Sequence, residues 1–399
     1  MRSEWMRAGW VAVVAALAAA CGPGGASAQE DAAAAAKVGQ QPPVGPREAT
    51  KPGFTVTPVA TYAEPWAMAF LPDGRFLVTE KKGTLRVGTQ AGAKSPPIAG
   101  TPKVEYGGQG GLGDVVLSPD FRHDRYVYLS WVEAGDGDTR GAAVGRAKLI
   151  IGPGVEGGRL EGLRVIWRQE PKVTGRGHFS HRMAFSPDGQ FLFITSGERQ
   201  KFTPAQDLSV NLGKVIRLTP TGGVPSTNPY YDQGRVTSQI WSYGHRNLLG
   251  IAFDAEGQLW DIEHGPAGGD EINLVSPKHN YGWPVVSNGD HYDGRPIPRH
   301  WTRPEFDAPK ISWNPVIAPG DFIWYRGSLF PDWRGQALAV GLASQSLVRI
   351  AREGDHLIEV ERYAFDNRLR EIREGPDGAL WVLEDGPTGR LLKLTPKAR

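Results

Sequence analysis

The chain has 399 residues, of which 40% are hydrophobic, so it is long enough to bury a large core. Its 52 glycines and 32 prolines make about a fifth of the chain, which is high for a helical protein and ordinary for short strands joined by many turns. The formal net charge of +2 and the lack of a long basic run argue against nucleic acid as a partner.

The first 28 residues are predicted to be an export signal. A short charged segment precedes an apolar run over 8–20 that is too short to span a bilayer, so we expect no transmembrane domain and a periplasmic or secreted location. Two processing routes stay open. The Ala-Ser-Ala sequence at 26–28 fits cleavage before Gln29, whereas the sequence ending at Cys21 resembles a lipoprotein signal, in which Cys21 would carry a lipid anchor. Cys21 is the only cysteine, which excludes an internal disulfide, a thiol nucleophile and a zinc–thiolate site.

Residues 29–52 are rich in Ala, Gln, Pro and Gly and show no apolar periodicity. This composition predicts a disordered linker. The folded domain is therefore expected to occupy residues 53–399.

From residue 53 onwards the sequence contains a loose repeat. Each copy has a turn of the Pro-Asp-Gly type and then a strand of alternating apolar residues, and the copies begin roughly 45 to 75 residues apart. The six copies begin at Leu71, Ser118, Ser186, Asp254, Phe330 and Gly375. Asp-Gly turns before alternating strands favour β-hairpins, and a β-unit repeated at this period is typical of a propeller. We therefore predict an all-β fold, a six-bladed β-propeller with four-stranded antiparallel blades.

The longest stretch without the repeat runs from Tyr281 to about Trp324 and is rich in aromatic residues and prolines. Long ordered loops in compact domains are usually functional. We expect this stretch to form a loop over one face of the propeller.

Two glycine-rich clusters in the first half of the domain could carry chemistry. Glycines at 107–113 surround Gln109 and would let the backbone approach another backbone or a flat ligand closely; a tight turn between blades is the alternative. His178 follows a glycine just before a predicted strand, where a general base can be held at the mouth of a fold. Glu198, one hairpin away, could fix its tautomer. A histidine in a surface turn is the alternative, and His181 is a rival for the same role.

The densest group of polar residues, glycines and aromatics lies near the middle of the domain. Arg246 and Asn247 could hold a ligand, because the arginine fork suits a carboxylate or a developing oxyanion. Gly265 and Pro266 could turn two carbonyl oxygens toward a hard cation, with Asp270 and Glu271 supplying anionic oxygen nearby. Oxygen ligands without thiols favour Ca²⁺ or Mg²⁺. A salt-bridged turn is the alternative.

Arg368 and Arg370 form the fourth cluster. In a strand, their side chains point to the same face, and two guanidinium groups side by side repel unless an anion lies between them. A multiply charged small molecule would satisfy both, whereas an exposed edge strand kept soluble by charge is the alternative. Because corresponding loops of different blades converge on one face of a propeller, clusters far apart in sequence can form one site.

These residues resemble a known family, the soluble pyrroloquinoline-quinone (PQQ)-dependent aldose sugar dehydrogenases, relatives of soluble glucose dehydrogenase. The motifs that carry the resemblance, in the family's order, are Gly-Gly-Gln-Gly-Gly-Leu-Gly-Asp at 107–114, Gly-Arg-Gly-His-Phe at 175–179, Gly-Glu-Arg at 197–199, Trp-Ser-Tyr-Gly-His-Arg-Asn at 241–247, Glu-His-Gly-Pro at 263–266, Gly-Gly-Asp-Glu at 268–271 and Asn-Tyr-Gly-Trp-Pro at 280–284. The resemblance implies a six-bladed propeller that binds PQQ and Ca²⁺ and oxidises the C1 hydroxyl of aldose sugars to lactones. It also implies an external electron acceptor, unknown from the sequence, and a monomer or homodimer.

The resemblance assigns roles to the residues that match the family's motifs. It implies that His178 is the catalytic base and that Glu198 is its carboxylate partner. Gln109 matches a position near sugar and cofactor. Arg246 and Asn247 match quinone-binding positions, with Arg246 near the oxygen on which negative charge develops.

The resemblance also implies metal and anion sites. Gly265 and Pro266 match backbone carbonyl ligands of the Ca²⁺ that polarises the quinone. Glu271 and the carbonyl of Tyr281 match a second, structural Ca²⁺. The arginine pair described above matches the residues that hold the carboxylates of the quinone.

The chain departs from the family at several places. Ser180-His181 replaces the usual Gly-Ser, and the stretch 342–347 lacks a lysine that the glucose-type enzymes use on the quinone. Two other functions stay open: a Ca²⁺-dependent propeller hydrolase of the sugar lactonase type, and a non-catalytic binding propeller. The hydrolase would need several carboxylates around one central metal and no arginine pair.

Overall fold

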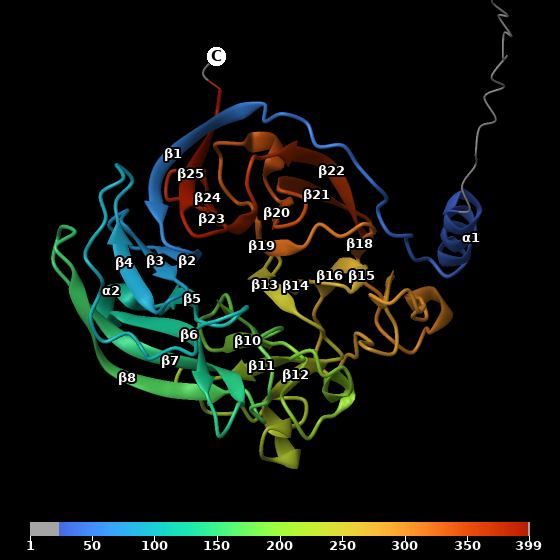
Figure 1. Ribbon diagram of the computed structural model, residues 1–399, viewed down its shortest axis with the longest axis horizontal. Coiled ribbons are helices and arrows are strands. Elements are labelled where there is room, and N and C mark those ends of the chain that lie inside the picture. The colour runs from blue at the N-terminus through green and yellow to red at the C-terminus, as the bar shows by residue number, and fades with distance from the viewer. Residues whose placement is uncertain (1–23, 398–399) are drawn as a thin grey trace, which may run out of the picture. The chain divides into compact units, whose positions relative to one another are not determined.

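The structure, a computed structural model, describes residues 24–397 (Figure 1). Cys21 and most of the predicted export signal lie outside these residues. Within them, no helix is long and apolar enough to cross a membrane. The helices are short apart from the first: α1 (Gly24–Lys37), α2 (Phe121–Asp124), η1 (Thr203–Gln206), η2 (Tyr231–Gln233), η3 (Thr237–Gln239), η4 (His300–Thr302) and η5 (Pro331–Trp333).

Residues 54–396 form six antiparallel blade sheets arranged in a ring, together with a small two-stranded sheet, so the predicted six-bladed propeller is confirmed (Figure 1). From the innermost strand outwards, blade 1 is β2 (Pro65–Phe70), β3 (Phe76–Glu80) and β4 (Thr84–Gly88); blade 2 is β5 (Leu112–Leu117), β6 (Tyr126–Ala134), β7 (Arg140–Ile151) and β8 (Gly158–Arg168); blade 3 is β9 (Ser180–Phe185), β10 (Leu192–Ser196), β11 (Lys214–Leu218) and β12 (Ile240–Tyr243). Blade 4 is β13 (Leu248–Phe253), β14 (Leu259–Glu263), β16 (Asp270–Leu274) and β18 (Ile311–Trp313); blade 5 is β19 (Pro319–Trp324), β20 (Ala337–Gly341), β21 (Ser346–Glu353) and β22 (His356–Ala364); blade 6 is β23 (Leu369–Glu374), β24 (Leu380–Glu384), β25 (Gly389–Pro396) and β1 (Phe54–Tyr62). Blade 1 has three strands, and the other five have the predicted four.

The ring closes through its first and last strands. β1 pairs with β25 in antiparallel register from Phe54 opposite Pro396 to Tyr62 opposite Gly389. The N-terminal strand therefore becomes the outermost strand of the C-terminal blade.

Each predicted Pro-Asp-Gly turn joins the innermost strand of a blade to its second strand. In four of the turns, the Asp side chain accepts a hydrogen bond from the backbone N–H two residues later, as at Asp73 and Arg75 (3.1 Å). The following glycine has positive φ, for example 85° at Gly74. This local chemistry explains why the sequence repeat reported the blades correctly.

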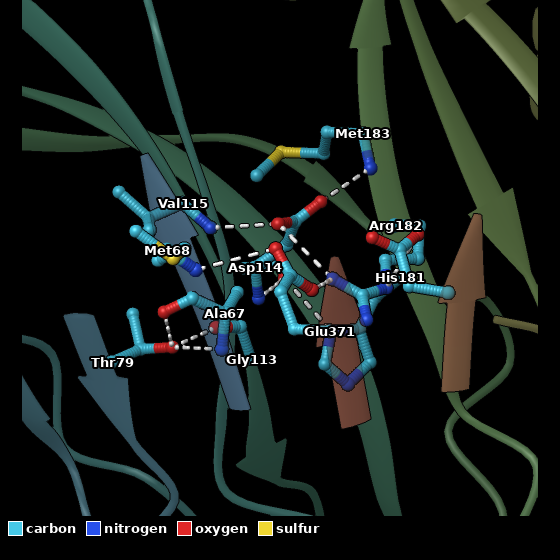
Figure 2. A network of polar contacts seen from close by, with 12 residues as sticks. Ala67, Met68, Thr79, Gly113, Asp114, Val115, His181, Arg182, Met183 and Glu371 are labelled. Carbon is cyan, nitrogen blue, oxygen red and sulfur yellow. Dashed lines mark hydrogen bonds and ion pairs between the residues drawn. The ribbon is translucent and has the colours of Figure 1, made fainter. Parts of the chain in front are cut away.

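The apolar core lies between neighbouring blades. Six clusters of buried residues each join two adjacent sheets around the ring. At the ring centre the innermost strands instead bury charges (Figure 2). Arg182 is fully buried and pairs with Glu371 and Asp114, while Arg373 pairs with Glu371 and Asp321. Removing one partner of such a network typically costs about 3–5 kcal/mol, because it strands a buried charge.

The structure differs from the predicted linker over 29–52. Residues 24–37 form α1, in which alanines are frequent and favour helix. In the propeller unit, Val44 pairs with the edge of β18 and Thr50 with the edge of β22, and Arg47 donates hydrogen bonds to the carbonyls of Glu359 and Val360. The open strand edges order this segment through backbone hydrogen bonds, which need no apolar periodicity.

The predicted aromatic loop over 281–324 is also interrupted. It contains β17 (Gly289–Asp290), which pairs with β15 (Ala267–Gly268), and it supplies the outermost strand of blade 4 and the innermost strand of blade 5. Only residues 275–310 form a long connection, between β16 and β18.

Candidate active site

His178 and Glu198 form a buried hydrogen-bonded pair. His178 precedes β9 and Glu198 follows β10, so two antiparallel neighbours bring them together. The imidazole Nδ1 lies 2.5 Å from Glu198 Oε1, and the carboxylate also accepts the backbone N–H groups of Gln200 (2.9 Å) and Phe202 (2.6 Å). Because Nδ1 donates its proton to Glu198, the proton-accepting lone pair is on Nε2.

The electrostatics keep His178 neutral. Burial lowers the pKa of His178, Glu198 opposes this shift, and Arg246 adds to it. Burial raises the pKa of Glu198, but the hydrogen bond from His178 and the backbone N–H groups outweigh it and lower the pKa overall. At neutral pH the pair is therefore a neutral imidazole held by a carboxylate, which is the protonation state of a general base.

The backbone around His178 is strained. His178, Ser180 and His181 have φ angles of 49°, 58° and 65°, which are unusual for residues with a Cβ. The backbone N–H of His178 donates to Gln109 Oε1 (2.7 Å). A Cβ at Gly108 would lie 2.6 Å from the carbonyl oxygen of Arg176, so the predicted close backbone approach in this glycine-rich turn is confirmed.

Arg246 and Asn247 present buried donors without partners. Their backbone N–H groups bind Glu263, and the Arg246 guanidinium donates to the carbonyl of His264 (3.1 Å) and to the hydroxyl of Tyr292 (3.2 Å). Within residues 24–397, Arg246 Nε and Asn247 Nδ2 have no hydrogen-bond partner. An unpaired buried donor costs about 1–3 kcal/mol, so these two atoms point to a ligand.

Arg368 and Arg370 share a carboxylate that the sequence did not reveal. Asp385 accepts from Arg368 Nε (2.9 Å) through one oxygen and from Arg370 Nε and Nη2 (3.0 and 2.8 Å) through the other. Burial raises the pKa of Asp385, but the two arginines lower it overall. The like-charge repulsion is therefore partly relieved within the protein, and one net positive charge remains.

The arginines line a cavity of about 300 Å³ at the start of the innermost strands. Its lining residues are Glu64, Trp66, Lys81, Gly108, Gln109, Phe179, Ser180, His181, Leu249, His264, Ala318, Leu342, Arg368, Arg370, Asp385 and Gly386. We call Lys81, Arg368 and Arg370 the cation wall of this cavity. His178, Arg246 and Asn247 border the cavity and connect to it through Gln109, Ser180 and His264.

His181, the rival base, also lines the cavity. Its Nδ1 lies 2.8 Å from the Ser130 hydroxyl and its ring stacks on Trp66. Burial lowers the pKa of His181 to about 3. Lacking a carboxylate partner among the described residues, it is a weaker candidate than His178.

A narrow cleft adjoins the cavity, and His264 lines both. Gly265, Glu271 and Tyr281 line this cleft, as expected for metal ligands, whereas Pro266 is buried but not among its lining residues. The Tyr281 carbonyl accepts from His300 Nε2 (3.2 Å).

Three buried carboxylates lie together at the cleft, and we call Asp261, Glu263 and Glu271 the carboxylate cluster. Asn273 Nδ2 lies 3.2–3.3 Å from an oxygen of each of the three, and His245 Nδ1 is 3.1 Å from Glu263. Burial, and then repulsion by Glu263, raises the pKa of Asp261 and of Glu271 well above the usual carboxyl value.

The donor set of the carboxylate cluster suits a cation. One ligand atom each from His245, Asp261 and Glu263 lies within 4.8 Å of the others. Asp261 Oδ2 and Asn273 Oδ1 have no hydrogen-bond partner in the described chain. A bound cation would satisfy both oxygens and relieve the repulsion.

Comparisons with known proteins show the family of the chain. A model of the glucose/sorbosone dehydrogenase family matches residues 62–393. The chain belongs to this family. It is 38% identical over 341 residues to the aldose sugar dehydrogenase YliI of Escherichia coli strain K12, covering 84% of this chain and 90% of that protein. A crystal structure of a glucose dehydrogenase matches with a TM-score of 0.81 and 41% identity, over 86% of this chain and 100% of that one. The PQQ-bound form of the aldose sugar dehydrogenase from Streptomyces coelicolor matches with a TM-score of 0.70 and 28% identity, over 87% and 99% of the chains.

The glucose/sorbosone dehydrogenase fold also explains which cavity residues the sequence missed. In four blades, the first residue after the second strand lines the cavity, namely Lys81, His264, Leu342 and Asp385. The second strand ends on the face where the innermost strand begins, because the two are antiparallel. Counting from each Pro-Asp-Gly turn to the end of the following strand would have found these positions.

Proposed function

We propose that this glucose/sorbosone dehydrogenase homologue is a PQQ- and Ca²⁺-dependent enzyme that oxidises the C1 hydroxyl of aldoses to lactones and passes the electrons to an external acceptor. The observation that carries the proposal is the His178–Glu198 pair beside a cavity walled by cations. The PQQ-bound Streptomyces coelicolor relative supports the cofactor.

The residues present fit a polyanionic quinone. The cation wall offers three positive groups against the carboxylates of Glu64 and Asp385. Arg246 Nε and Asn247 Nδ2 are buried donors without an acceptor among the described residues, so a ligand acceptor can bind them. These groups would hold PQQ, which when bound supplies the acceptor for the C1 hydride.

The protein's own residues would move the proton. His178 Nε2 accepts the proton of the C1 hydroxyl, and Glu198 stabilises the imidazolium that results, since it already binds Nδ1. Gln109 fixes the backbone of His178 and lies in the cavity, where it can bind a sugar hydroxyl. Arg246 adds fixed positive charge beside the pair, which favours negative charge developing nearby.

Calcium would occupy the cleft side of the site. Gly265 and Glu271 line that cleft, and the adjacent carboxylate cluster supplies the hard anionic oxygen that Ca²⁺ prefers. A bound ion would offset the repulsion among carboxylates that burial intensifies.

The hydrolase alternative fits less well. It needs several carboxylates around one metal in the central channel. There, Asp114 and Glu371 are paired with Arg182 (Figure 2). Arg373 pairs with Glu371 and with Asp321. Two arginines in that network leave little negative charge for a divalent ion.

A reconstitution assay tests the proposal. Purified apoprotein is mixed with Ca²⁺ and PQQ, and aldoses are added with an electron-accepting dye. We expect dye reduction, and we expect His178→Ala to lower kcat by about 10²–10⁴-fold while PQQ absorbance is retained after desalting. No dye reduction and no retained PQQ would contradict the proposal, and lactone hydrolysis in its place would favour the alternative.

We also propose a periplasmic or secreted location, because of the export signal predicted over 1–28. Cell fractionation and mass spectrometry of the mature N-terminus test this. Cleavage before Gln29 predicts a free N-terminal segment, whereas acylated Cys21 predicts a membrane-anchored one. A full-length cytoplasmic protein would contradict both.

A further inference from the structure

Lys81 is a half-buried cation without an acidic partner. It is the first residue after β3, and it lines the cavity. Its hydrogen bond within the described chain goes to a neutral acceptor, the carbonyl of Gly108 (3.0 Å). No carboxylate of residues 24–397 lies within ion-pair distance of it. Burial lowers the pKa of Lys81 and the nearby Arg370 adds to this shift, while Glu64 and Asp385 oppose it without being in ion-pair contact.

The nearest carboxylates are already occupied. Glu64 accepts from the hydroxyl of Tyr106 (2.7 Å) and lies 3.8 Å from Lys82. Asp385 uses both of its oxygens on the two arginines of the cation wall. An ammonium near Arg370, with no carboxylate in ion-pair contact among the described residues, is explained if an anionic ligand completes the site.

The position of Lys81 around the ring supports this explanation. Blade 6 carries Arg370 on its innermost strand and Arg368 just before that strand, and blade 1 lies directly beside it, with β2 against β23. On the other side of blade 6, blade 5 contributes the uncharged Ala318 and Leu342 to the cavity. Positive charge therefore extends from blade 6 in one direction only, toward Lys81.

We propose that Lys81 binds a carboxylate of the quinone cofactor, next to the carboxylate-binding site of Arg368 and Arg370. This inference rests on the proposed function, since it assigns a residue of the same cavity. It makes blade 1 part of the cofactor site and predicts a preference for quinones that carry several carboxylates over uncharged ones.

The test measures binding and needs no turnover. PQQ is titrated into apoprotein with Ca²⁺ present, and the Kd is obtained from tryptophan fluorescence. Lys81→Gln keeps a donor for the Gly108 carbonyl and removes the charge, so we expect a Kd about tenfold higher. Lys81→Arg should restore the Kd to within a few-fold of wild type. Lys82→Met is the matched control, because Lys82 is the next residue, its side chain is 66% exposed and it does not line the cavity; its Kd should be unchanged.

The outcomes separate the two proposals. Wild-type and Lys81→Gln proteins of equal thermal stability that bind PQQ equally would overturn the role of Lys81 and leave the proposed function standing. A wild-type protein that binds no PQQ would overturn the proposed function and this inference with it. Equal weakening by Lys82→Met would also overturn the inference, because it would show a general charge effect.

Discussion

Blades 6 and 1 line the larger cavity with cations, whereas blade 4 buries carboxylates in the adjoining cleft. In both regions, residues at the end of a second strand contribute: Lys81 and Asp385 follow the second strands of blades 1 and 6, and Glu263 ends the second strand of blade 4. They differ in the sign of the prevailing charge: the cation wall carries three positive groups against Glu64 and Asp385, and the carboxylate cluster consists of three acidic groups. Two opposite charge imbalances side by side are what the proposed binding of an anion and a cation together requires.

The largest expected effect is on the cation side. Arg370→Met should weaken PQQ binding by about 10- to 100-fold, because a charge-assisted hydrogen bond of about 1.5–3 kcal/mol is lost. The Kd for PQQ, measured with Ca²⁺ present, checks this. Asp385→Asn is the matched control: it makes the wall more positive and should not weaken binding. Equal weakening by both changes would show that the geometry of this triad, and not its charge, holds the ligand.

An effect of intermediate size is expected on the thermal stability of carboxylate-cluster variants, and its sign should depend on whether Ca²⁺ is present. Asp261→Asn removes one of the repelling buried charges, so in EDTA the variant should unfold at a higher temperature than wild type. In Ca²⁺ the order should reverse, because a ligand has been lost. We expect differences of about 1–3 kcal/mol, measured by calorimetry. Asp332→Asn, at an exposed carboxylate of η5, should change neither. An Asp261→Asn protein less stable than wild type in both conditions would contradict a cation site.

The smallest expected effect is the pH dependence of the free energy of unfolding of the metal-free protein. Because the pKa values of Asp261 and Glu271 are raised in the folded state, the folded protein binds more protons than the unfolded chain between the usual carboxyl range and the raised values. The free energy of unfolding in EDTA should therefore be highest at acid pH and fall as the pH rises through this window. Saturating Ca²⁺ should flatten the slope. Denaturant titrations from pH 5 to 8 measure this slope. A slope that Ca²⁺ leaves unchanged would show that the carboxylate cluster does not bind the metal.

The fold was predictable because its signal is local. Each Asp-Gly turn is stabilised by its own side chain and backbone, so the six turns in the sequence predicted six blades. The missing fourth strand of blade 1 and the ordered segment over 43–52 were not predictable, since both depend on whether a distant strand edge is available.

The site was predictable in part, because some of its residues also have a local sequence signal. His178, Glu198, Arg246 and Asn247 stand in dense motifs, and the structure brings them together. Asp385 and Lys81 belong to no recognisable sequence motif. Their place in the site follows only from the way blades 6 and 1 converge on the cavity.

The pairing of β1 with β25 has a consequence for how the molecule unfolds. In an open solenoid, each repeat contacts only its neighbours and end repeats can fray independently. Here the first and last strands of the propeller pair in one sheet, so no blade is terminal and the loss of any one blade opens the ring. The binding groups of the candidate site lie around the central cavity on several blades, so the closed ring fixes their mutual distances.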